Sequence, residues 1–99
     1  MKYEILTTEI FDQWLSRLKD KQAISAIGKR LLRAEAGNLG DVKPVGSGIS
    51  EMRIFVGKGY RVYFSIKGSK LILLLNGGHK GTQAEDVKLA KAINKQVEV

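Results

Sequence analysis

Apolar positions recur at helical spacing through the first third of the chain. A short extended segment covers residues 3–7, and Thr8 then stands where it can cap a first helix, with Glu9 suited to the positive helix end. Asp20 is placed to cap a second helix that ends at Gly37. Because the join between them is tight, the two helices predict a helical hairpin. The apolar stripes are formed by Phe11, Trp14, Leu15, Leu18, Ile24, Ile27, Leu31 and Ala34.

From Asp41 onward the period of the apolar positions changes from helical to two, which is typical of strands. Pro44 confines the first, short strand to an edge or a strand start. A turn of Gly57-Lys58-Gly59 joins two alternating segments into a hairpin. Leu71–Leu75 is apolar on both faces, so we expect it centrally in the sheet. The predicted strand segments are 43–45, 51–56, 60–67 and 71–75.

The chain closes with a third amphipathic segment. Thr82 and Glu85 have capping-box spacing for a last helix, and its apolar side carries Val87, Ala90, Ile93 and Val97. We summarise the order as β-α-α-β-β-β-α. This order predicts one small α+β domain over residues 1–99, with an N-terminal helical hairpin packed on a mainly antiparallel, twisted sheet.

The predicted hairpin gathers basic side chains on one sheet face. If the apolar residues of both strands share the core, Arg53 and Arg61 project together from the opposite face, beside Tyr63. Guanidinium groups match phosphate oxygens, and a tyrosine ring offers a surface on which an unstacked base can lie. The alternative is an ordinary solvated face with ion pairs such as Glu51–Arg53.

A second candidate is the glycine-rich stretch at residues 76–83, which we predict to be a loop from the last strand into the last helix. Backbone N–H groups at a helix start favour anions, and Lys80 adds a mobile positive charge. His79 is the only histidine; it could transfer a proton, and by itself it cannot build a metal site. The alternatives are an ordinary connection and an exposed loop histidine.

Composition narrows the class of partner. Seventeen Lys+Arg against ten Asp+Glu give a formal charge of +7, which favours a polyanion, although charge kept for solubility would look the same. The absence of cysteine removes disulfides, thiolate metal sites and cysteine nucleophiles. We see no signal segment and no membrane-length apolar run, and therefore expect a cytoplasmic protein without a membrane partner.

Two stretches resemble a known family. The run RLLRAEAGNLGDVKPVGSGISEMRIFVGKGYRVYF, followed by LLLNGGHKGTQAEDVKLA, is similar to the phage Gp49-like branch of the RelE/ParE toxin superfamily, whose members are often labelled HigB-like or addiction-module killer proteins. The similarity spans nearly the whole chain. It implies a toxin of a type II toxin–antitoxin system that enters the ribosome and cuts messenger RNA without a metal or other cofactor.

The resemblance also implies roles for residues. In the family reaction a ribose 2′-hydroxyl attacks the adjacent phosphorus, expels the 5′-oxygen and leaves a 2′,3′-cyclic phosphate. Arg61 corresponds to the family's phosphate-contacting arginine, Arg53 occupies a position where relatives have Lys or Arg, and Lys80 falls where a basic residue follows the last strand. Some relatives carry a base-stacking tyrosine near the C-terminus, and this chain has none after Tyr63. The expected site is therefore catalytic Arg53, Arg61 and Lys80, with His79 in proton transfer and Tyr63, Lys58, Lys43 and Thr82 contacting RNA.

Three functions remain open on the same scaffold. The first is the endoribonuclease, with the ribosome and messenger RNA as partners. The second is a ParE-type inhibitor of DNA gyrase, and the third is an inactive module that only binds its antitoxin. The resemblance implies a small helix-turn-helix antitoxin as partner, and DNA would be reached only indirectly, through the toxin–antitoxin complex.

Overall fold

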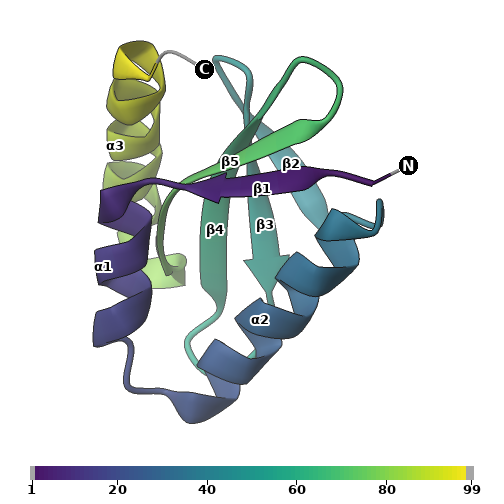
Figure 1. Cartoon of the computed structure of the whole chain (residues 1–99). Coiled ribbons are helices and arrows are strands. Elements are labelled where there is room, and N and C mark those ends of the chain that lie inside the picture. The colour runs from purple at the N-terminus through teal and green to yellow at the C-terminus, as the bar shows by residue number, and fades with distance from the viewer. Residues whose placement is uncertain (1, 98–99) are drawn as a thin grey trace.

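The structure is a computed structural model that describes residues 2–97. Four strands follow the helical pair, as the four predicted strand segments require, whereas the summary order β-α-α-β-β-β-α counts only three. The α+β class is confirmed. No helix within residues 2–97 is both long and apolar enough to cross a membrane. The elements in Figure 1 are β1 (Glu4–Thr7), α1 (Glu9–Arg17), α2 (Lys21–Glu35), β2 (Val42–Gly46), β3 (Ile49–Ile54), β4 (Tyr60–Lys67), β5 (Leu71–His79), a short 3-10 turn η1 (Lys80–Thr82) and α3 (Gln83–Gln96).

Both predicted N-caps of the first two helices are confirmed. The Thr8 hydroxyl accepts from the Phe11 N–H at 3.0 Å, and the Asp20 carboxylate accepts from the Ala23 N–H at 3.1 Å. The two helices diverge in an open V across the sheet rather than lying side by side (Figure 1). Each therefore packs most of its apolar stripe against strands, with Phe11 and Ile27 fully buried; the expectation for Ile24 is wrong, because it is 38% exposed and Ala23 takes the inward position instead.

The five strands form one sheet in the order β1-β5-β4-β3-β2. β1 runs parallel to β5, and the other pairings are antiparallel. Pro44 lies in the edge strand β2, as predicted. The pairing of β4 with β5 shifts between Tyr63 and Phe64, where β5 contributes one extra residue; residues 72–78 of β5 are buried on both sides of this bulge.

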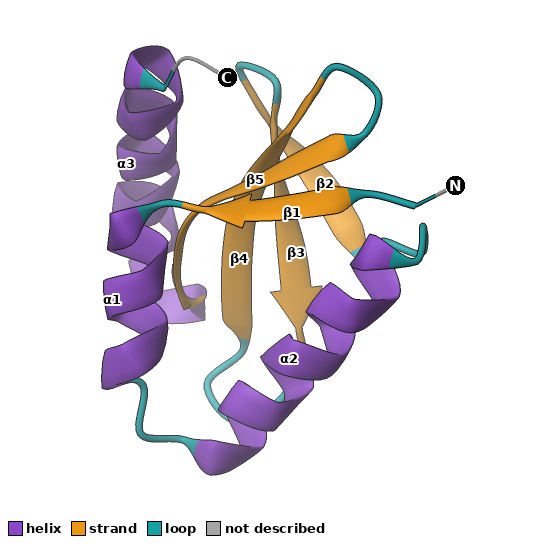
Figure 2. Cartoon of the chain, viewed as in Figure 1, coloured by secondary structure: helices purple, strands orange, loops and turns teal. Residues whose placement is uncertain are grey.

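Helices cover the two sheet faces unequally (Figure 2). α1 and α2 pack over one face, whose core includes Phe11, Ile27 and Val62. α3 packs on the opposite face over β4 and β5, with Ala90 and Ile93 in its core. The core under α3 extends to Ile49 of β3 and the partly buried Val45 of β2, and the open part of this face, which carries Arg53, lies beyond them toward the β3–β4 turn.

The structure overturns two local predictions around the glycine-rich stretch. Residues 76–79 continue β5 instead of forming a loop. Gly77 and Gly78 suit a strand here because other groups occupy the space of a side chain: a Cβ on Gly77 would overlap the Trp14 ring, and one on Gly78 would overlap the Asp86 carboxylate. The capping box also lies three residues earlier than predicted, between His79 and Thr82, and Thr82 makes no side-chain cap to α3.

Candidate functional site

A small pocket of about 130 Å³ lies at the turn end of the β3–β4 hairpin. Arg53 and Arg61 are directly opposite each other in the antiparallel pairing, so both side chains leave the same face. The backbone N–H of Lys80 donates to the carbonyl of Gly59 at 2.8 Å and ties η1 to the hairpin turn. The structure thus brings the three predicted catalytic cations together. The lining residues are Arg53, Ile54, Phe55, Gly59, Tyr60, Arg61 and Lys80.

Arg53 is held at the rim by a carboxylate that the sequence reasoning did not single out. Its Nη2 lies 2.8 Å from the Asp41 carboxylate, and this hydrogen bond raises the pKa of Arg53 above its ordinary value. The Arg30 side chain of α2 donates to the backbone carbonyl of Arg53 and so fixes that end of β3. The guanidinium also lies 5.8 Å from the centre of the Phe55 ring, which is 75% exposed. An anion that binds Arg53 must either displace the Asp41 carboxylate or share the Arg53 guanidinium with it.

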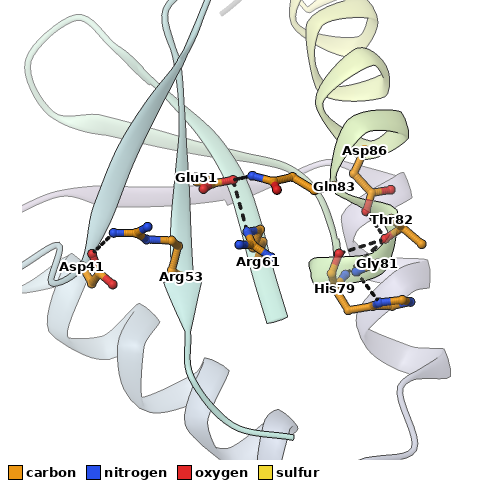
Figure 3. A network of polar contacts seen from close by, with 9 residues as sticks. All are labelled: Asp41, Glu51, Arg53, Arg61, His79, Gly81, Thr82, Gln83 and Asp86. Atoms are coloured by element: carbon orange, nitrogen blue, oxygen red, sulfur yellow. Dashed lines mark hydrogen bonds and ion pairs between the residues drawn. The ribbon is translucent and has the colours of Figure 1, made fainter. Parts of the chain in front are cut away.

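Arg61 is held from behind by a different carboxylate. Its Nε lies 3.4 Å from Glu51, whose side chain is 1% exposed, while that of Arg61 is 13% exposed (Figure 3). The side-chain amide of Gln83, at the start of α3, donates to the same Glu51 oxygen at 2.9 Å. The ion pair Glu51–Arg53 that the sequence suggested is wrong, and each arginine has its own acid.

Tyr63 does not face the site. Its side chain is 0% exposed and packs with Leu75, Ala90 and Ile93 under α3. Burial, followed by the nearby charge of Glu51, raises the pKa of its phenol to about 12. The prediction that Tyr63 stacks on an RNA base is therefore wrong. The strand alternation gave the correct face, but α3 covers that face at this point.

His79 and Thr82 are engaged with their own turn. The His79 Nδ1 accepts from the Gly81 N–H at 3.1 Å, and the Thr82 hydroxyl accepts from the His79 N–H at 3.3 Å (Figure 3). Thr82 also donates to the Asp86 carboxylate. Neither residue lines the pocket, although His79 precedes Lys80 directly. Proton transfer by His79 and RNA contact by Thr82 stay predictions.

Lys43 and Lys58 are exposed and lie outside the pocket lining. Lys43 is opposite Glu51 in the β2–β3 pairing, and Lys58 is the tip of the hairpin turn. Their contact with RNA also stays a prediction. Within the described part of the chain, no group of three or more His, Cys, Asp or Glu side chains could hold a metal ion.

The sequence pattern does not reveal the polar residues that position the site. Asp41 and Gln83 lie 12 and 32 residues from their partners Arg53 and Glu51, and no local pattern signals such contacts. Tyr60, assigned to the apolar set, lines the pocket while its hydroxyl donates to Asp20 at 3.2 Å. One signal in the sequence is Glu51, a carboxylate between the apolar Ile49 and Met52. The structure shows that it lies in a strand with little exposure.

Comparison with solved structures defines the class of fold. The chain superimposes on an arginine-to-alanine double mutant of the E. coli toxin RelE in the free state with a TM-score of 0.72 and 14% identity, covering 98% of this chain and 100% of that one. It also matches a chain of the toxin–antitoxin complex RelBE2 from Mycobacterium tuberculosis, with a TM-score of 0.63 and 18% identity over 81% of this chain and 100% of that one. The fold is that of the RelE toxins, which confirms the resemblance to the RelE/ParE superfamily at the level of fold.

Sequence comparison gives the family. An uncharacterized protein of Haemophilus influenzae strain Rd is 45% identical over 97 residues, which is 98% of each chain. The chain belongs to the same family as that protein. No family model matches it.

Proposed function

We propose that this chain is the toxin of a toxin–antitoxin pair and that it cleaves messenger RNA on the ribosome without a metal. The observation that most directly supports this proposal is that Arg53, Arg61 and Lys80 line one pocket. Two structures with this fold support the first part: one is named as a toxin and the other was solved as a toxin–antitoxin complex. The formal charge of +7 supports a polyanionic substrate.

The proposed chemistry divides among the three cations. The RNA 2′-hydroxyl attacks the adjacent phosphorus and loses its proton, while the bond from phosphorus to the 5′-oxygen breaks and that oxygen takes up a proton. Arg61 and Arg53 donate to the non-bridging phosphate oxygens, where negative charge grows in the transition state. Lys80 is exposed at the pocket edge and assists the leaving oxygen. His79, next to Lys80 at the end of β5, is the candidate acceptor of the hydroxyl proton.

The proposed partners follow from the same surface. A small helix-turn-helix antitoxin would neutralise the toxin by covering its basic face with an acidic or amphipathic segment, and DNA would be contacted only through the complex. The ribosome would present the messenger RNA strand to the pocket. Lys43 is exposed in β2, opposite Glu51 and two residues from Asp41, the ion-pair partner of Arg53, which supports a contact with the RNA backbone there.

The decisive test uses bacterial ribosomes programmed with a defined, end-labelled messenger RNA. Wild-type protein is expected to give codon-positioned cuts in primer extension, with 2′,3′-cyclic phosphate ends. Lys80→Ala and Arg53→Ala should each lower the rate about 100-fold or more, as for other removed transition-state donors. Lys70→Ala, which removes an exposed lysine in the turn between β4 and β5, is the matched control and should cut normally.

Two results would overturn the proposal. If Lys80→Ala and Arg53→Ala cut like wild type, the pocket is not the active centre. If wild type makes no cuts but poisons purified DNA gyrase, the gyrase alternative holds. Harmless expression without the antitoxin, together with no cuts, would indicate an inactive antitoxin-binding module.

A further inference from the structure

A buried carboxylate lies directly behind the pocket. Glu51 is 1% exposed, and its oxygen is within 3.4 Å of the Arg61 Nε and 2.9 Å of the Gln83 amide nitrogen. Glu51 does not itself line the pocket, whereas Arg61 does. A charge with so little access to water is retained in a folded protein only when fixed partners compensate it. Glu51 therefore faces Arg61 and not the substrate.

We propose that Glu51, held in place by Gln83, is a positioning residue that fixes the Arg61 guanidinium for phosphate binding. This inference rests on the proposed function. The three side chains form two successive contacts that connect three elements. Gln83 begins α3, Glu51 lies in β3, and Arg61 lies in β4 (Figure 3).

Glu51 would help the reaction by restricting the conformations of the Arg61 side chain and not by adding charge to the site. A free arginine samples many rotamers, and freezing them on substrate binding opposes the reaction. A carboxylate at the Nε edge restrains the plane of the guanidinium, and the terminal nitrogens are then the groups that would donate to phosphate oxygens in the pocket that Arg61 lines. Misplacing such a donor by about 1 Å is enough to slow a reaction roughly 100-fold.

The first arm of the test measures cleavage on programmed ribosomes. Glu51→Gln keeps the size of the side chain and can still accept from Gln83, but it loses the charge that restrains Arg61. Its kcat should fall by about 100-fold with KM little changed, because a mispositioned arginine weakens the transition state more than ground-state binding. Glu85→Gln, which removes an exposed carboxylate from the first turn of α3, is the matched control and should behave as wild type. A kcat of Glu51→Gln equal to wild type, in folded protein, would overturn the inference.

The second arm does not depend on cleavage. In side-chain NMR of isotope-labelled protein, the Arg61 Nε–H should exchange slowly with solvent. Glu51→Gln should accelerate this exchange by about tenfold or more, because it removes the carboxylate charge that lies 3.4 Å from the buried Nε. Glu85→Gln should leave it unchanged. Unchanged exchange in Glu51→Gln would refute the restraint even if cleavage were lost.

The two arms separate the possible failures. If wild type does not cleave RNA, the proposed function fails, and the exchange rates still decide whether Glu51 restrains Arg61. If Glu51→Gln does not fold, Gln83→Ala carries both measurements, because it keeps both charges and removes only the support of Glu51. It should then show faster Arg61 exchange and a smaller loss of kcat, and wild-type values in both would overturn the inference.

Discussion

Replacing Arg61 is expected to cost stability as well as activity. Arg61→Met keeps a long side chain in β4 but leaves Glu51 with only the Gln83 amide as a partner. Glu51 is 1% exposed and cannot turn toward water without opening the face under α3. Removing one partner of a buried ion pair typically costs about 3–5 kcal/mol, because the remaining charge stays desolvated. Since small domains have a free energy of unfolding of about 5–15 kcal/mol, this loss is a large fraction of the total.

The reverse change should be milder. Arg61 is 13% exposed and borders the pocket, so after Glu51→Gln its guanidinium can donate hydrogen bonds to water. We expect Glu51→Gln to cost about 1–2 kcal/mol, a value between those of an exposed ion pair and a fully buried one, because Arg61 keeps some access to water. In the double variant Arg61→Met with Glu51→Gln no charge is left buried, and its stability should lie within about 1 kcal/mol of wild type.

Urea denaturation followed by circular dichroism measures all four proteins of this double-mutant cycle. We expect a coupling free energy of at least about 2 kcal/mol between positions 51 and 61. If Arg61→Met unfolds at the same urea concentration as wild type, or if the two single changes simply add, Glu51 is not held by Arg61. The double variant also gives the cleaner test of catalysis, because it should be folded and inactive.

Three further changes test other parts of the structure. Tyr63→Phe should keep cleavage and be as stable as wild type or up to about 1 kcal/mol more stable, because the buried hydroxyl has no partner among the described residues. Since the pKa of Tyr63 is raised from 10.0 to about 12, the folded protein keeps a phenol proton that the unfolded chain loses, so wild-type stability should fall as pH rises above 10 and Tyr63→Phe should lose less; urea titrations at neutral and alkaline pH measure both. Gly77→Ala should lower the melting temperature and cost about 1–3 kcal/mol, because the new methyl group meets the Trp14 ring; an unchanged melting temperature would contradict the close packing. Asp41→Asn should release Arg53 and strengthen binding of a short RNA by less than about tenfold, as measured by fluorescence anisotropy at low salt, whereas weaker binding would mean that Asp41 orients Arg53 for RNA.

The sequence by itself determined the parts of this protein that depend on neighbours along the chain. The Thr8 and Asp20 caps form hydrogen bonds to N–H groups three residues away. The change of period from helical to two marked the passage from helices to sheet, and the hairpin around Lys58 placed Arg53 and Arg61 on one face. These features depend on the backbone geometry of helices and strands, which the residue pattern reports directly.

Tertiary structure decided which helix covers each face of the sheet and which carboxylate pairs with each arginine. Tyr63 and Arg61 lie on the same face of β4. α3 buries Tyr63, whereas Arg61 lines a pocket, and the alternation along β4 cannot distinguish these two outcomes. The Glu51–Gln83 contact joins residues 32 positions apart, and its existence depends on how α3 docks on the sheet. Alternation assigns a side chain to a face, whereas burial and ion pairing depend on the elements that pack there from elsewhere in the chain.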